Sequence, residues 1–199
     1  MKPPLGIAIS NLIRASISGI SFIGLEWLRN VEHLHMHVVN RMPPNIRGVF
    51  HNLTHLELMF NFHSDDASAV FKWRWLRKML QNTPNLQTLI IHELYKVLPL
   101  CLDEELQRFY VKGWKDPKIV PECLLSHLTT CSLTNYSLIP SELQFAKYIM
   151  QNSRLLNTIT IQSAEFLDTN TKLQMLIELS SCPRISPTSI LFLFYLNDA

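Results

Sequence analysis

An apolar pattern recurs along the chain, with apolar residues at the first, fourth and sixth positions of a six-residue segment. The clearest copies begin at Val31, Leu53 and Leu86, and further copies begin at Leu12, Leu128 and Leu156. Side chains alternate between two faces in an extended strand, so the fourth and sixth positions of each copy point the same way. The pattern therefore predicts six strands that share one buried face.

One such copy cannot cover its own apolar face, whereas stacked copies bury it against one another, as in leucine-rich repeats. We therefore expect an α/β fold, namely an irregular leucine-rich-repeat solenoid with a parallel sheet on the concave side and helices and loops on the convex side. The fourth positions follow at intervals of 19, 22, 33, 42 and 28 residues, so the longer intervals must hold insertions.

One insertion, residues 69–81, has the spacing of an amphipathic helix, and the acidic and serine residues just before it suit a helix start. We expect its apolar side to comprise Phe71, Trp75, Leu76, Met79 and Leu80. Arg74, Arg77 and Lys78 are expected on the outer side. This mixture of basic and aromatic residues is also found in nucleic-acid-binding segments, but an inward Trp75 favours an ordinary solvated helix, and we predict no nucleic-acid partner.

Two more helices are expected nearer the C-terminus. Residues 141–150 carry apolar residues at helical spacing behind Ser141, which suits a cap position, and residues 171–181 continue to a stop at Pro183. The apolar run 190–196 is too short to cross a membrane and predicts a buried terminal strand. Residues 94–121 are the least repeat-like, and we divide the chain there into a leucine-rich-repeat region, 1–110, and a second region, 111–199, that continues the array.

The composition narrows the function class. The chain has 199 residues, 47% hydrophobic and 17% charged, which excludes a disordered tail, and its formal charge of +2 gives no strong field towards nucleic acid or membrane. The four cysteines form no CxxC pair, and we interpret them as reduced thiols in a cytoplasmic or nuclear protein. No secretion signal is visible, and we expect no membrane association.

The C-terminal region contains five segments that follow one another at residues 120–128, 142–152, 155–161, 172–179 and 183–186. In order and spacing they resemble the opening, the helix, the following strand, and the closing helix and turn of the FBD domain of plant F-box/LRR proteins. The resemblance covers roughly 118–193, and the stretch 24–94 is similar to the preceding repeats of that family. It implies a protein-protein interaction module like the substrate-binding part of an F-box subunit of a cullin-type ubiquitin ligase.

Members of that family usually begin with an F-box that binds a Skp-type adaptor. The sequence shows no N-terminal helical unit with the Leu-Pro opening of an F-box, so a Skp-type adaptor is in doubt as a partner of this chain. The alternative is a repeat scaffold or truncated family member with no ubiquitin-ligase role.

The alternation of strand residues also predicts a candidate surface for an unknown target protein on the concave face. Its residues from the first repeats are His33, His35, His37, His55, Glu57, Met59, Thr88, Ile90 and His92. The small polar residues Thr130, Ser132, Thr134, Thr158, Thr160 and Gln162 continue it. The alternative is that these are solvated strand residues without a function.

Histidines bind zinc and copper, but no cysteine or carboxylate completes an obvious ligand set beside His33, His35 and His37, so we predict no metal and no cofactor. A pH-dependent protein contact fits these histidines better. None of the nucleotide-binding or hydrolase motifs that we sought is present, and we predict no catalytic residues and no enzyme.

Overall fold

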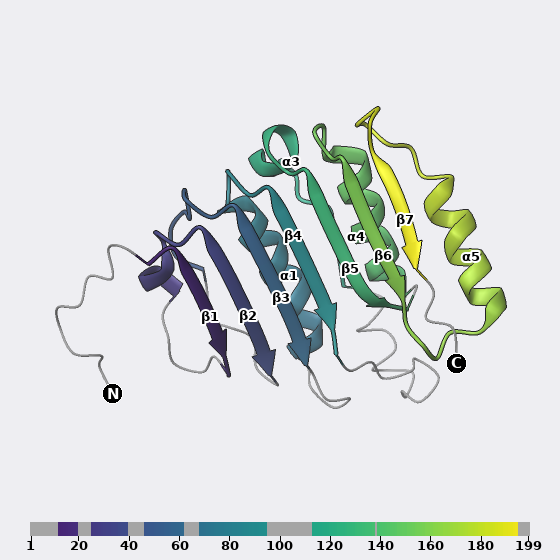
Figure 1. Ribbon diagram of the computed structural model, residues 1–199, viewed down its shortest axis with the longest axis horizontal. Coiled ribbons are helices and arrows are strands. Elements are labelled where there is room, and N and C mark those ends of the chain that lie inside the picture. The colour runs from purple at the N-terminus through teal and green to yellow at the C-terminus, as the bar shows by residue number, and fades with distance from the viewer. Residues whose placement is uncertain are drawn as a thin grey trace.

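The computed structural model describes residues 12–19, 25–39, 46–61, 68–94, 113–137 and 139–194. Seven strands form one sheet in the order of the sequence, and every neighbouring pair is parallel (Figure 1). The strands are β1 (Arg14–Ser18), β2 (His33–Val39), β3 (His55–Asn61), β4 (Thr88–Glu93), β5 (Thr130–Tyr136), β6 (Thr158–Ser163) and β7 (Ile190–Phe194). The six strands expected from the apolar pattern are confirmed.

The register aligns equivalent repeat positions across the sheet. Leu34 pairs with Leu56, which pairs with Leu89, and the row continues through Cys131 and Ile159. These side chains are fully buried. Because equivalent positions of successive repeats are stacked, the apolar face of each repeat is covered by that of its neighbours.

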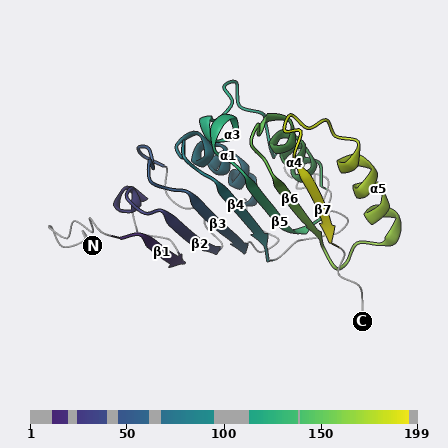
Figure 2. The same cartoon turned by 45° about the horizontal axis from the view of Figure 1, so that its top comes forward.

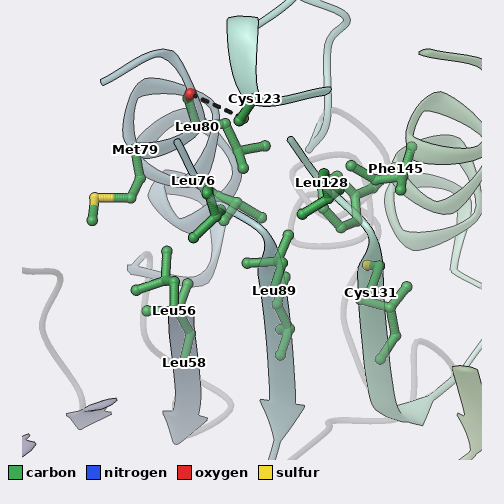
Figure 3. Packing of buried hydrophobic residues seen from close by; sticks show 14 of the residues in the cluster. Leu56, Leu58, Leu76, Met79, Leu80, Leu89, Cys123, Leu128, Cys131 and Phe145 are labelled. Atoms are coloured by element: carbon green, nitrogen blue, oxygen red, sulfur yellow. Dashed lines mark hydrogen bonds between the residues drawn. The ribbon is translucent and has the colours of Figure 1, made fainter. Parts of the chain in front are cut away.

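The helices lie along one face of the sheet: in the views of Figures 1 and 2 the two long central helices lie behind the strands, and the last helix lies beside the C-terminal edge of the sheet. They are η1 (Leu25–Leu28), α1 (Ser68–Gln81), α3 (Glu122–Ser126), α4 (Pro140–Asn152) and α5 (Thr169–Ser180). Figure 3 shows the core between the layers, where Leu76 and Leu80 of α1 and Phe145 of α4 face the strand residues Leu89 and Cys131. The observed architecture is thus α/β, a seven-stranded parallel sheet with helices on one side.

Two cysteines belong to this core. The Cys123 thiol donates to the carbonyl oxygen of Leu80 at 3.5 Å, joining α3 to α1 (Figure 3). Burial raises the pKa of Cys123 and of Cys131 to about 12, because a thiolate loses its hydration there. Cys123, Cys131 and Cys182 are free thiols, as predicted for the cysteines, while Cys101 lies outside the described residues.

An aromatic cluster joins α1 to α4. Trp114 meets Phe145 edge-on at 4.8 Å between ring centroids, and it contacts Trp73 in the same manner at 6.1 Å. Gly113 lies so close that an added Cβ would be 2.4 Å from Trp73 and 2.6 Å from Ser141, so only glycine fits there. The sheet likewise continues from β4 to β5 without a break in register. The division at residues 110 and 111 falls outside the described residues and stays a prediction.

Helix α1 differs from the prediction in which residues face inward. Trp75, Leu76, Met79 and Leu80 are buried as expected, but the expectation for Phe71 was wrong, since 53% of it is exposed. Lys72, which the amphipathic pattern did not place in the core, is only 6% exposed. Its ammonium group pairs with Glu93 at the end of β4 and lies over the ring of Trp73. The expected acidic helix start lies outside the described residues.

The helix start predicted at Ser141 was also wrong in detail. The N-cap is Ile139, Pro140 occupies the first turn, and Ser141 is buried within the helix. Proline suits this place because its missing N–H needs no partner there. The carboxylate of Glu142, the next residue of the helix, accepts a hydrogen bond from the backbone N–H of Ser137 at 2.9 Å. Helix α5 begins as predicted near Thr171, with Asp168 accepting the N–H groups of Asn170 and Thr171.

Strand β7 is confirmed, but its predicted burial was wrong. Alternate residues Ile190, Phe192 and Phe194 are exposed, while Leu191 and Leu193 pack partly against the core. Such alternation is expected of a strand covered on one face only. In the described part of the chain, no helix is long and apolar enough to span a membrane.

Truncating Leu89, which is buried in the central strand β4, is expected to weaken the fold. Leu89→Ala should lower the free energy of unfolding by about 2–5 kcal/mol, because it leaves a cavity between α1 and the sheet. Ile177→Ala, at an exposed position of α5, is the control and should change it by less than about 0.5 kcal/mol. Urea unfolding followed by circular dichroism measures both, and equal effects would contradict the described core.

The Lys72–Glu93 pair provides a second test, because removing one of the two buried charges leaves the other buried without its partner. Lys72→Met should lower the free energy of unfolding by about 3–5 kcal/mol. The double variant with Glu93→Leu should recover most of this loss, since neither charge then remains buried. If the single and double variants are equally unstable in urea titrations, the two side chains are not partners.

Candidate partner-binding face

The side of the sheet away from the helices, here called the open face, is covered by no described element (Figure 1). Because the strands are parallel and in register, its side chains form rows across them. The first row is Arg14, His33, His55, Thr88, Thr130, Thr158 and Ile190, and the second is Ser16, His35, Glu57, Ile90, Ser132, Thr160 and Phe192. The third is Ser18, His37, Met59, His92 and Thr134, with Gln162 and Phe194 beyond a bulge in β5.

Each residue predicted for the candidate surface lies in these rows, and each is partly buried rather than free in solvent. The structure therefore brings together the nine surface residues predicted from the first repeats, from His33 on β2 to His92 on β4. That they bind a partner stays a prediction.

A series of polar contacts crosses the middle of the open face from β2 to β5, with an ion-pair contact between His35 and Glu57 and hydrogen bonds from Glu57 through His92 to Thr134. The Glu57 carboxylate lies 3.3 Å from Nδ1 of His35 and 3.0 Å from Nε2 of His92. The other ring nitrogen of His92, Nδ1, lies 2.8 Å from the Thr134 hydroxyl. In the tautomer whose Nε2–H donates to Glu57, Nδ1 of His92 accepts a hydrogen bond from the Thr134 hydroxyl. These contacts hold four side chains in place, which lowers the entropic cost of binding a partner.

The first row contains a basic group, here called the N-terminal corner, formed by Arg14, His33 and His55. The rings of His33 and His55 are 5.4 Å apart between centroids and tilted by 36°. Partial burial lowers the pKa of His55, and the charges of His33 and Arg14 lower it further, while Glu57 opposes them. The corner thus places three basic side chains from adjacent strands together, with no carboxylate in its own row on these strands.

The opposite end of the open face is apolar. Ile190, Phe192 and Phe194 project from β7, and the two phenylalanine rings stack with centroids 6.3 Å apart and planes 16° from parallel. Sequence reasoning missed these residues because a continuous apolar run does not reveal which face is covered. Their signal was the register, since each occupies the position equivalent to a predicted surface residue on β6.

A metal site is not apparent in the described part of the chain, where no group of three or more histidine, cysteine, aspartate or glutamate side chains could hold an ion. His33, His35 and His37 follow one another along β2, and His37 is instead within 3.4 Å of the Ser18 hydroxyl. The absence of a metal remains a prediction for the whole chain.

The helix side carries a separate hollow of about 630 Å³ between α4 and α5. Its lining includes the exposed amides Gln144, Gln151 and Gln174, with Lys147, whose ammonium pairs with Glu178 at 2.5 Å. This hollow lies across the sheet from the open face and serves below as a control surface.

Comparison with known proteins gives one family match. Residues 115–161 match the FBD family. The match includes β5, α4 and the first part of β6, whereas α5 and β7 lie beyond it. It therefore supports part of the segment in which the sequence resembled an FBD domain.

The chain is also similar to curated proteins of Arabidopsis thaliana. It is 35% identical over 187 residues to an F-box/FBD/LRR-repeat protein, a match that covers 88% of this chain and 38% of the relative. A putative F-box/FBD/LRR-repeat protein is 30% identical over 88% of this chain and 38% of its own, and a putative FBD-associated F-box protein is 29% identical over 90% and 41%. The chain thus spans about two fifths of the length of these relatives. No solved structure matches it.

The lowered pKa of His55 predicts a pH dependence of stability. As the pH falls, the unfolded chain takes up this proton first, near its ordinary pKa of 6.5. Acidification therefore favours unfolding, and the stability that neutral His55 contributes is complete above this pKa and lost below it. His55→Asn should show a flatter decline in the free energy of unfolding between pH 7.5 and pH 5. Thr158→Ala, in the same row, should keep the wild-type slope, and a shared slope in all three proteins would contradict the prediction.

Proposed function

Because the chain is a relative of the plant F-box/FBD/LRR-repeat proteins and carries an FBD segment, we propose that it is a protein-protein interaction module that binds a target protein on its open face. One observation carries the proposal: the residues on one side of the inner strands are buried in the core, while the other side bears an ordered, partly buried set of side chains with no described element above it. The parallel sheet in sequence order is consistent with a leucine-rich-repeat solenoid, and we propose that the open face is its concave side.

The composition of the open face supports recognition of a protein surface. Its hydrogen-bonded centre around Glu57 offers oriented polar groups, and the stacked Phe192 and Phe194 offer exposed aromatic area. Interfaces of proteins are enriched in aromatic residues beside a limited number of placed polar groups. The mechanism is positioning of the target, without chemistry at this face.

The relatives are named as F-box proteins, and this supports a role as the target-binding part of an F-box subunit of a cullin-type ubiquitin ligase. The alternative is a scaffold or competitor that holds the same target without a ligase. We place either activity in the cytoplasm or nucleus, because the free thiols of Cys123, Cys131 and Cys182 suit a reducing compartment.

Affinity capture from plant extract tests the proposal with three baits. They are the intact chain, an open-face variant with His35, Glu57 and His92 changed to alanine, and a helix-side variant with Gln144, Gln151 and Gln174 changed to alanine. Proteins that bind the open face should be at least about tenfold depleted with the first variant, since it removes the charged contacts at the centre. The helix-side variant should retain them.

Quantitative mass spectrometry distinguishes the outcomes. Skp-type adaptor subunits recovered with the target support the ligase role, and target without adaptor supports the scaffold. If the helix-side variant loses the captured proteins while the open-face variant keeps them, the proposed binding face is wrong. Circular dichroism of all three baits establishes that each is folded.

A further inference from the structure

The charge on the open face is unevenly distributed. Among its described positions Glu57 carries the one carboxylate, whereas Arg14 and five histidines lie on the same face. Glu57 contacts His35 in the second row and His92 in the third row, and its charge also raises the pKa of His55. The N-terminal corner itself contains one arginine and two histidines and no carboxylate.

We infer that the N-terminal corner, formed by Arg14, His33 and His55, is an anion-binding site that receives a carboxylate side chain of the target protein. The inference deepens the proposed function and rests on it. Three adjacent strands place these side chains in one row, and the two imidazole rings lie side by side, so a carboxylate above them meets donors from each strand. Arginine and protonated histidine both form charge-assisted hydrogen bonds with carboxylates.

The groups facing His55 agree with this assignment. Arg14 on β1 and His33 on β2 are cationic or become so on protonation, His35 is occupied by Glu57, and Thr88 on β4 does not titrate. Burial is the largest cause of the lowered pKa of His55, and the charges of His33 and Arg14 lower it further against the opposing charge of Glu57. A bound anion counteracts the effect of those two positive charges. Binding should therefore raise the pKa of His55 and take up a proton, so affinity increases as the pH falls from 8 to 6.

The apolar residues of β7 lie six strands from Arg14 on β1 and four strands from His55 on β3, at the far end of the sheet. With strands about 4.8 Å apart, β1 and β7 are about 29 Å from each other. The target surface that fits is consequently acidic where it meets β1 to β3 and apolar where it meets β7.

Histidine NMR of the intact 199-residue chain tests the site with acetylated hexaglutamate as probe and acetylated hexaglutamine as its uncharged control. Hexaglutamate should shift the ring resonances of His33 and His55 and leave those of His127, which lies outside the open face, in place. The apparent affinity should weaken with added salt and as the pH rises from 6 to 8.

Arg14→Gln should weaken hexaglutamate binding at least about tenfold, the effect of losing one charge-assisted contact. Arg154→Gln removes the same charge from an exposed turn off the open face and should have no such effect. His33→Asn provides a second variant at the corner. Equal binding by all variants, or equal shifts with hexaglutamine, overturns the anion site.

The capture experiment separates this result from failure of the proposed function. If the alanine variant at the centre of the open face loses its target but Arg14→Gln retains it fully, the open face binds the target and the anion site is wrong. If the central variant retains its target, the proposed function fails, whatever hexaglutamate does.

Discussion

The start of each strand from β2 to β6 is held by one backbone carbonyl of the preceding repeat, which accepts hydrogen bonds from two consecutive N–H groups. The Thr54 carbonyl accepts from Gln87 at 2.8 Å and from Thr88 at 2.9 Å, and the Thr129 carbonyl accepts from Asn157 and Thr158 in the same way. A slip of one residue would turn every side chain of a strand to the other face. Since the same positions of successive repeats face the core, burial and hydrogen bonding enforce one register.

That register produces both the core and the candidate site. Leucine and isoleucine rows face the helices, and the intervening residues must then form rows on the open face. Residues far apart in the sequence become neighbours for this reason alone: Glu57 and His92 are separated by 35 residues, yet their side chains are 3.0 Å apart. The candidate surface is thus a consequence of stacking, and its chemistry varies from one end to the other without disturbing the core.

The sequence predicted the strands and the membership of the open face well, because period-two alternation survives irregular spacing between repeats. It did not predict that Lys72 is buried, since only the tertiary structure brings Glu93 and the ring of Trp73 to its ammonium group. It also could not reveal the exposure of Phe192, because an edge strand of uniform apolarity has no alternation to interpret. The sequence also did not predict the hydrogen bond between His92 and Thr134, because these residues are 42 positions apart and only the strand register makes them neighbours.

Site-specific photo-crosslinking tests the central claim, that the open face binds the target, most directly. A benzophenone side chain replaces Ser132 in the middle row of the open face in one bait and Gln174 beside the helix-side hollow in another. After irradiation in plant extract, the account predicts a discrete adduct from position 132 that excess unlabelled chain abolishes, and none from position 174. A competable adduct from position 174 alone would contradict it.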